Sequence, residues 1–311
     1  MFIHFYFVTL HRITNKNTNM RYVYVTGYIL LAVIIQLLTG NFPLSFLAFP
    51  LNVIFAVIGL FLLYILNKEY KSLQFTGFLR SSQTSILSII LFVAGCLVIG
   101  LFPQLSDREA EMREGICASL GCYNFMTSWI FIAILILLLS NLALIIVRGW
   151  QNRKQSRWRY LLNHAGLWLA LFAGFIGSSD TQTLRIPLYK GEPTQEAFDL
   201  NGASCHLDYE MELHSFAVEY YPNGRPLRFV ADVRLGDETA VLEVNHPYSY
   251  RWGEDIYLTG YDVIGGNNSN YCILQVVKQP WKYVMVVGIL MMLVGTILLF
   301  INGPRRYDKL G

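Results

Sequence analysis

Six long apolar runs constrain the fold of this chain more than any other feature of its sequence. A helix needs roughly 20 mainly apolar residues to cross the hydrocarbon core of a bilayer, which is about 30 Å thick. Six segments meet this requirement: 22–41, 44–66, 85–103, 127–148, 160–178 and 281–302. Charged residues make up only 14% of the chain, against about 25% in a soluble domain. We therefore predict an α-helical membrane bundle of about six transmembrane helices.

Lys and Arg are concentrated in four of the segments outside these runs. Cytoplasmic loops of membrane proteins carry an excess of Lys and Arg, and with six spans all four basic segments fall on one side. Both termini are therefore predicted to be cytoplasmic, with 104–126 and 179–280 outside. Met20-Arg21 directly precedes the first run, which favours Met20 as an alternative start. The predicted divisions are a tail 1–21, a three-span region 22–103, a loop 104–126, two spans with a basic loop 127–178, an outer domain 179–280, a last span 281–302 and a tail 303–311.

The first two apolar runs are separated only by Gly40 to Pro43. Such a short connection predicts a tight helical hairpin. Pro50 falls inside the second run, and because proline lacks the amide N–H that a helix interior needs, we expect a kink there.

The outer segment 179–280 alternates apolar and polar residues, which is typical of half-buried β-strands. In 205–213 the odd-numbered residues are apolar, and the apolar phase changes afterwards, so we expect a bulge near 214–215. Turns are predicted at 222–224 and 236–237, and further strands at 255–261 and 271–278. The expected fold is an antiparallel β-rich domain, a sandwich or an open barrel, between the last two spans.

Four of the five cysteines fall in segments predicted to be outside. Cys117 and Cys122 share the loop 104–126, and Cys205 and Cys272 share the outer domain. An extracytoplasmic compartment permits disulfides, so one local disulfide in each region is the most economical arrangement, although the spacing does not fix the connectivity. The four residues between Cys117 and Cys122 do not form a redox CxxC motif. Cys96 lies within a span and is expected to be a buried structural thiol.

His164 is an ionisable residue within a span, about one turn from the predicted cytoplasmic end. Such residues are costly in a bilayer and usually face the bundle or a cavity. A neutral imidazole offers the nitrogen that haem iron takes as an axial ligand, whereas the alternative is an interfacial histidine bonded to a lipid headgroup or a helix carbonyl. Small residues four apart, Gly166, Ala170 and Gly174, predict close helix packing on the same span.

Histidines of the outer domain have simpler interpretations. His206 to His214 form an alternating polar row, but alternate residues of a strand lie nearly 7 Å apart, so a solvated strand face is favoured over a metal site. His246 lies between turn-forming Asn245 and Pro247 and is expected to be exposed.

Several blocks of sequence resemble the ResB (CcsB) family of cytochrome c biogenesis proteins. The resemblance is carried by Asn163-His164-Ala-Gly166-Leu-Trp168 and covers about 127–304. The other blocks are 141–144, 148–150, 174–180, 244–250, 256–262 and 275–283.

This resemblance implies a membrane subunit that helps move haem outward and holds apocytochrome c for covalent haem attachment. It implies a ResC (CcsA)-type polytopic partner, location in a bacterial inner membrane and transient binding of haem b. His164 matches the position of a family haem ligand, and Trp168, one turn further along, would line the porphyrin edge. The six tryptophans are scattered, so the chain lacks the partner's tryptophan-rich segment and is expected to be the non-catalytic half of the synthetase.

The sequence leaves two other classes of function to compare with this one. A small-molecule permease or a membrane scaffold with an exported β domain is the alternative, but the chain shows no internal repeat and few ionisable residues in its spans. A membrane thiol oxidoreductase would need a CxxC pair. The expected partners are therefore the ResC (CcsA)-type protein, apocytochrome c and the lipid bilayer, and no nucleic acid is expected.

Overall fold

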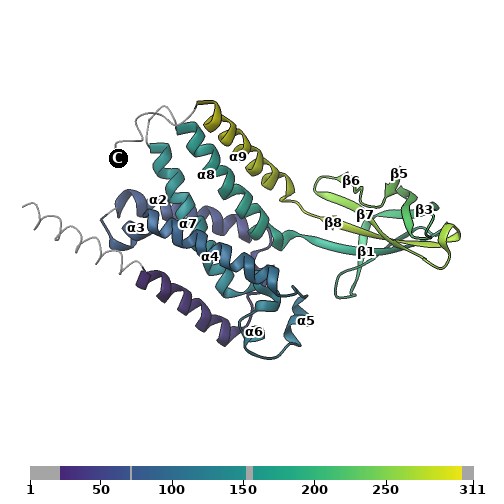
Figure 1. Ribbon diagram of the computed structural model, residues 1–311, viewed down its shortest axis with the longest axis horizontal. Helices are drawn as coiled ribbons and strands as arrows, with labels where there is room; N and C mark the ends of the chain where they lie inside the picture. Colours follow the sequence, from purple (N-terminus) through teal and green to yellow (C-terminus); the bar gives the residue numbers. More distant parts are fainter. Residues whose placement is uncertain (1–21, 71, 152–156, 303–311) are drawn as a thin grey trace, which may run out of the picture. The chain divides into compact units, whose positions relative to one another are not determined.

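A computed structural model describes residues 22–70, 72–151 and 157–302 (Figure 1). The predicted tails 1–21 and 303–311, with the alternative start at Met20, lie outside the described residues. Within the described ranges, six helices are long and apolar enough to cross a membrane, and an eight-stranded antiparallel sheet lies between the last two. The predicted fold class is therefore confirmed. The spans are Tyr22–Thr39, Leu51–Glu69, Ser82–Leu101, Trp129–Gln151, Trp158–Asp180 and Lys282–Ile301.

The described residues form two compact units. The membrane unit takes in the chain up to Ile176 and resumes at Val284, and the outer unit is Gly177–Tyr283. Each unit is described separately below.

Helix α7 (Trp129–Gln151) is the centre of the membrane unit. It contacts α2 (Leu51–Glu69), α4 (Ser82–Leu101) and α8 (Arg157–Leu171), and 61% of its most apolar window is buried. The other spans bury far less and present apolar side chains on their outer surfaces. This arrangement is expected of a bundle whose peripheral helices face lipid.

The predicted kink at Pro50 is wrong. The chain forms a short 3₁₀ helix, η1 (Leu44–Leu47), and α2 begins at Leu51, directly after Pro50. A proline at a helix start removes an N–H that would have no intrahelical partner, so it begins the helix instead of bending it. The connection between the first two spans is consequently longer than the four residues expected.

Short helices fill the segments between spans. Helix α3 (Gln74–Leu79) precedes α4. The segment 104–126 contains α5 (Asp107–Glu111), α6 (Ile116–Ser119) and the start of a 3₁₀ helix, η2 (Cys122–Thr127). The fifth span changes from α-helix to a π-helix, η3 (Phe172–Ile176), and then to a 3₁₀ turn, η4 (Gly177–Asp180). After the outer unit the chain returns through α9 (Lys282–Asn302).

The outer unit is one sheet with the strand order β5-β4-β3-β2-β1-β8-β7-β6, and every pair is antiparallel. A 3₁₀ turn, η5 (Gly266–Asn268), lies between β7 and β8. The strands are β1 (Gln182–Tyr189), β2 (Thr194–Phe198), β3 (Ser204–Tyr220), β4 (Pro226–Leu235), β5 (Glu238–Glu243), β6 (Tyr248–Arg251), β7 (Glu254–Tyr261) and β8 (Tyr271–Lys278).

Five local predictions for this sheet are confirmed. The register of β3 shifts between Leu213 and Ser215, which is the expected bulge. Turns at 222–224 and 236–237 join β3 to β4 and β4 to β5. The strands predicted at 255–261 and 271–278 are β7 and β8. Strands β1, β2 and β6 were not predicted.

The core of the outer unit lies on one face of the curled sheet. Buried residues alternate along the strands, as in Leu207, Tyr209, Met211 and Leu213 of β3. Strand β5 contacts β7, which is not its hydrogen-bonded neighbour. Since a single sheet closes over its own core while keeping two free edges, the open-barrel alternative describes it better than a sandwich of two sheets.

Candidate functional site

His164 lies on α8 with one ring nitrogen already bonded. Its Nδ1 is 2.8 Å from the carbonyl oxygen of Tyr160, one turn earlier on the helix. A carbonyl only accepts, so Nδ1 carries the proton and Nε2 keeps its lone pair when the ring is neutral. This is the tautomer in which metal-binding histidines are usually held, with the other ring N–H donated to a carbonyl or carboxylate. The donor chemistry therefore fits an axial ligand of haem iron.

The imidazole is half-buried, and one of its faces is covered by Tyr160. The two ring centroids are 4.1 Å apart, at an interplanar angle of 33°. Among the described residues, no hydrogen bond to Nε2 is formed. The alternative interpretation of His164, a histidine bonded to a helix carbonyl, holds for Nδ1. Nε2 remains available to a ligand.

Close packing of α8 against α9 fixes the helix that carries His164. A Cβ atom on Gly166 would lie 2.5 Å from the carbonyl oxygen of Gly288, and one on Gly288 would lie 2.6 Å from that of Gly166. Thr296 of α9 donates a 3.2 Å hydrogen bond to Oδ1 of Asn163. The small residues predicted to permit close approach therefore face one another across this helix pair.

Trp168 points toward α7. Its Nε1 donates a 3.1 Å hydrogen bond to the carbonyl oxygen of Leu139, and its ring stacks on Phe172 with centroids 5.0 Å apart. It lines an apolar groove of about 420 Å³ between α2, α7 and α8, and His164 does not line this groove. The two predicted haem contacts therefore do not both line this groove.

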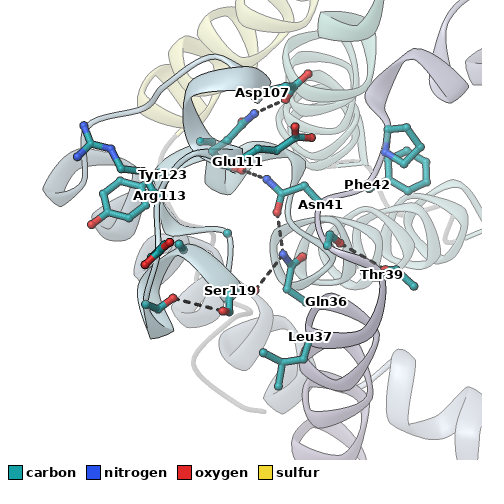
Figure 2. A pocket seen from close by; sticks show the side chains of 18 residues that line it. Gln36, Leu37, Thr39, Asn41, Phe42, Asp107, Glu111, Arg113, Ser119 and Tyr123 are labelled. Atoms are coloured by element: carbon teal, nitrogen blue, oxygen red, sulfur yellow. Dashed lines mark hydrogen bonds between the residues drawn. The ribbon is translucent and has the colours of Figure 1, made fainter.

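A cavity of the membrane unit lies in the segment predicted to be outside, and we call it the cap cavity (Figure 2). Its volume is about 670 Å³, and its walls are the end of the first span, residues 40–43 and the short helices α5, α6 and η2. Gln36 and Asn41 point toward each other on one side of it (Figure 2).

Hydrogen-bonded amide side chains fix the wall of the cap cavity. Gln36 is 2% exposed, donates to Oδ1 of Asn41 at 2.7 Å and accepts from the backbone N–H of Trp129 at 2.9 Å. Asn41 in turn donates to Oγ1 of Thr127 at 3.0 Å. Asp107 accepts from the amide of Asn124 at 2.6 Å. Gln36 also donates to the carbonyl oxygen of Ser119 at 3.3 Å, and Asn41 to that of Asn124 at 3.2 Å. These two bonds join the end of the first span to the 104–126 segment, and their long sequence separations explain why sequence alone did not reveal them.

The cysteines are all free thiols, and the prediction that Cys96 is buried is wrong, because its side chain is exposed on the surface of α4. Burial raises the pKa of Cys122, and the neighbouring Cys117 thiol raises it further, so the two thiols lie close together. Cys272 is fully buried in β8, and burial raises its pKa to about 12, whereas Cys205 is half-buried on β3. Strands β1 and β2 separate β3 from β8 in the sheet. Neither predicted disulfide is formed in this structure. The Cys117–Cys122 and Cys205–Cys272 pairings therefore remain predictions.

Metal-binding groups are absent from the described ranges: no three His, Cys, Asp or Glu side chains there are placed to hold an ion. In the row from His206 to His214, His206, Asp208 and His214 are exposed and the two glutamates are half-buried, as expected of a solvated strand face. His246 is exposed, as expected. The exposed turn at Asn245 has a φ of 63°, which Asn tolerates better than most residues.

Two of the ResB-like blocks meet at one place in the outer unit. Trp281 donates a 2.5 Å hydrogen bond from Nε1 to Asp180. A Cβ atom on Gly177 would lie 2.5 Å from Cγ of Trp281, so only glycine allows this contact. The start and the end of the outer unit are therefore joined by residues that carry the resemblance.

Comparison with known proteins supports the family resemblance. Residues 151–270 match the sequence model of the ResB-like family, which confirms the resemblance over α8 and strands β1 to β7. No curated protein matches the chain. A solved structure described as cytochrome c heme lyase CcmF is similar over 79% of this chain, with 13% identity and a TM-score of 0.36. The chain spans 44% of that protein, and a likeness at this level carries no argument about function.

Proposed function

We propose that this protein is a membrane subunit of cytochrome c maturation, which helps move haem outward and holds apocytochrome c during haem attachment. The ResB-like match over residues 151–270 supports a role in cytochrome c biogenesis in general. In this proposal the chain acts with a ResC (CcsA)-type partner as the non-catalytic half of the synthetase. It lies in a bacterial inner membrane, with both termini cytoplasmic and residues 179–280 outside.

The observation that carries the haem part of the proposal is the bonded state of His164. Its Nδ1–H is held by the Tyr160 carbonyl, and the Tyr160 ring stacks on the imidazole. Both contacts fix the direction of Nε2 before any ligand arrives, so little side-chain freedom is lost on binding. Haem b, when bound, would supply an iron centre that accepts this nitrogen as one axial ligand. A second ligand would come from a partner helix, or that position would remain open.

The contact with the porphyrin edge assigned to Trp168 stays a separate prediction. Its indole N–H is bonded to Leu139 and its ring lies in the apolar groove. A Trp168→Phe variant retains an aromatic ring and loses the N–H. It should shift the haem absorption band if Trp168 touches the porphyrin, and leave it unchanged if Trp168 only positions α8.

The outer unit is proposed to hold apocytochrome c. In the part of the chain that the structure describes, the sheet ends at two edge strands, β5 and β6, and β5 makes one isolated bridge, from Glu243 to His246. A free edge presents backbone donors and acceptors to which an extended peptide can add as another strand. An unfolded apocytochrome segment has the extended backbone that this mode of binding needs.

A complementation experiment tests the proposed function. Cells lacking this protein should lose haem-stained c-type cytochromes, and the wild-type chain should restore them. His164→Ala should fail to restore them while accumulating to the wild-type level in the membrane. His246→Ala, which removes an exposed outer histidine, is the matched control and should restore them fully. Restoration by His164→Ala would contradict the haem role of His164, and normal cytochromes without the protein would contradict the proposed function.

A further inference from the structure

Two arginines from distant parts of the sequence meet at the end of the membrane unit predicted to be cytoplasmic. Arg80 follows α3, and Arg148 lies in the last turn of α7. Nη1 of Arg148 donates a 3.0 Å hydrogen bond to the carbonyl oxygen of Arg80. Burial lowers the pKa of Arg80, and the charge of Arg148 lowers it further, so the two guanidinium groups repel each other. We call these two residues the arginine pair.

The backbone that carries Arg80 is held rigidly. Three successive carbonyl groups at the end of α3 accept hydrogen bonds from side chains: Thr84 bonds to Phe78 at 2.7 Å and Asn141 to Leu79 at 2.6 Å. Arg148 completes the series with its bond to Arg80. A guanidinium has five N–H donors, and this bond uses one donor of Arg148. The remaining donors of the pair are therefore presented from a fixed framework.

Negative charge is almost lacking on this side of the chain. The four basic segments contain only two acidic residues, Glu69 and Asp308. Glu69 pairs with the adjacent Lys68 at 3.5 Å, and Asp308 lies outside the described residues. Among residues 22–70, 72–151 and 157–302, no carboxylate lies within salt-bridge distance of either member of the arginine pair. The counter-charge for the pair must then come largely from outside these segments.

We propose that Arg80 and Arg148 bind one oxyanion, either the phosphate of a phospholipid headgroup or a carboxylate of an amphipathic small molecule. Guanidinium groups recognise both through paired, charge-assisted hydrogen bonds. The site lies beside the helix that carries His164, because Gly149 packs against the ring of Tyr160, which stacks on His164. The proposal concerns the anion alone and does not depend on iron binding by His164.

Two pairs of probes distinguish the two sources of the oxyanion. Native mass spectrometry of the full chain from mild detergent compares retention of phosphatidylglycerol with retention of phosphatidylcholine. Fluorescence titration compares metal-free protoporphyrin IX, which has two carboxylates, with its dimethyl ester, which has none. Since neither porphyrin contains iron, this arm is independent of the axial-ligand proposal.

The informative variant is Arg80→Gln, because the backbone contacts of Arg80 survive the change. It should weaken binding of the preferred anionic probe by roughly tenfold or more, as expected for loss of a charge-assisted hydrogen bond. Arg80→Lys should weaken it less, because it keeps the charge. Lys68→Gln removes one positive charge from the same membrane side at a residue already paired with Glu69, and it should have little effect.

The site is supported if the wild-type chain binds either anionic probe more tightly than its neutral counterpart, and if this preference is lost in Arg80→Gln but kept in Lys68→Gln. The anionic probe that is preferred then identifies the source of the oxyanion. Equal binding of charged and neutral probes in both arms would overturn the proposal. Equal losses in Arg80→Gln and Lys68→Gln would also overturn it, because they would indicate a general surface potential. The heat-unfolding temperature of each variant shows that it is folded, and if Arg80→Gln does not fold, the same comparison is made with Arg80→Lys.

Discussion

The crossing of α8 and α9 at Gly166 gives the sharpest test of the membrane packing. The change is Gly166→Ala, which adds one methyl group. Its Cβ would lie 2.5 Å from the carbonyl oxygen of Gly288 and 3.0 Å from Cβ of Met291. Carbon–oxygen contacts between packed helices are about 3.3–3.6 Å, so the helices must separate by roughly an ångström. The oxygen belongs to backbone and cannot move by changing a rotamer.

The expected change in the free energy of unfolding follows from two opposing contributions. Overpacking in a close-packed site costs about 1–3 kcal/mol. Alanine is intrinsically more favourable than glycine in a helix interior, by about 1 kcal/mol. Gly59→Ala on α2 is the matched control, because a Cβ there would meet nothing within 4 Å. The difference between the two variants removes the intrinsic term, so Gly166→Ala should be less stable than Gly59→Ala by about 1–3 kcal/mol.

The assay is unfolding of the purified protein in mild detergent, followed by tryptophan fluorescence on heating. Gly166→Ala should unfold several degrees below Gly59→Ala, and Gly288→Ala should resemble Gly166→Ala because both add a methyl to one crossing. The double variant should cost less than the two single changes together, since neighbouring changes are not additive. Equal unfolding temperatures for Gly166→Ala and Gly59→Ala would refute the close crossing.

Three further predictions concern particular polar groups. Burial raises the pKa of Asp255, but hydrogen bonds from Lys282 and Ser249 lower this pKa below its usual value overall. The stability that the Asp255 carboxylate contributes should therefore be present above about pH 4 and fall at lower pH. Asp255→Asn should flatten melting temperatures measured between pH 6 and pH 3, and an unchanged slope would contradict this. Asn141→Ala should destabilise the protein by about 1–3 kcal/mol by removing the bond to the buried α3 turn, with Gly59→Ala again the reference. Cys272 should resist iodoacetamide at pH 8 until the protein is unfolded, because burial raises its pKa to about 12; mass spectrometry that finds it alkylated in the native protein would contradict that burial.

Features that depend on local sequence were predictable. The spans follow from apolar runs, and strands β3, β4 and β5 follow from alternation and their turns. Strand β1 was missed although Leu184, Ile186 and Leu188 alternate in it, because Pro187 interrupts the pattern of a typical strand. Strand β2 buries only Ala197 completely, and its sequence therefore shows almost no alternation of apolar and polar residues.

The candidate site was predictable only in part. The position of His164 within a span identified it, and its bond to Tyr160 is a contact within one helix turn. The direction of Trp168 depends on a carbonyl group of α7, 29 residues away. The contact between Arg148 and Arg80 spans 68 residues. Contacts of this length depend on how helices pack, and sequence periodicity carries no information about which side chains meet there.

The visible absorption spectrum of the protein tests the central claim most directly. The chain would be purified in mild detergent with its ResC-type partner, as wild type and as His164→Ala. We predict a Soret band in the wild type that is lost or weakened in His164→Ala and restored by added imidazole, which replaces the missing ligand. A Soret band of equal intensity and position in both proteins, or a colourless wild-type complex, would contradict haem ligation by His164.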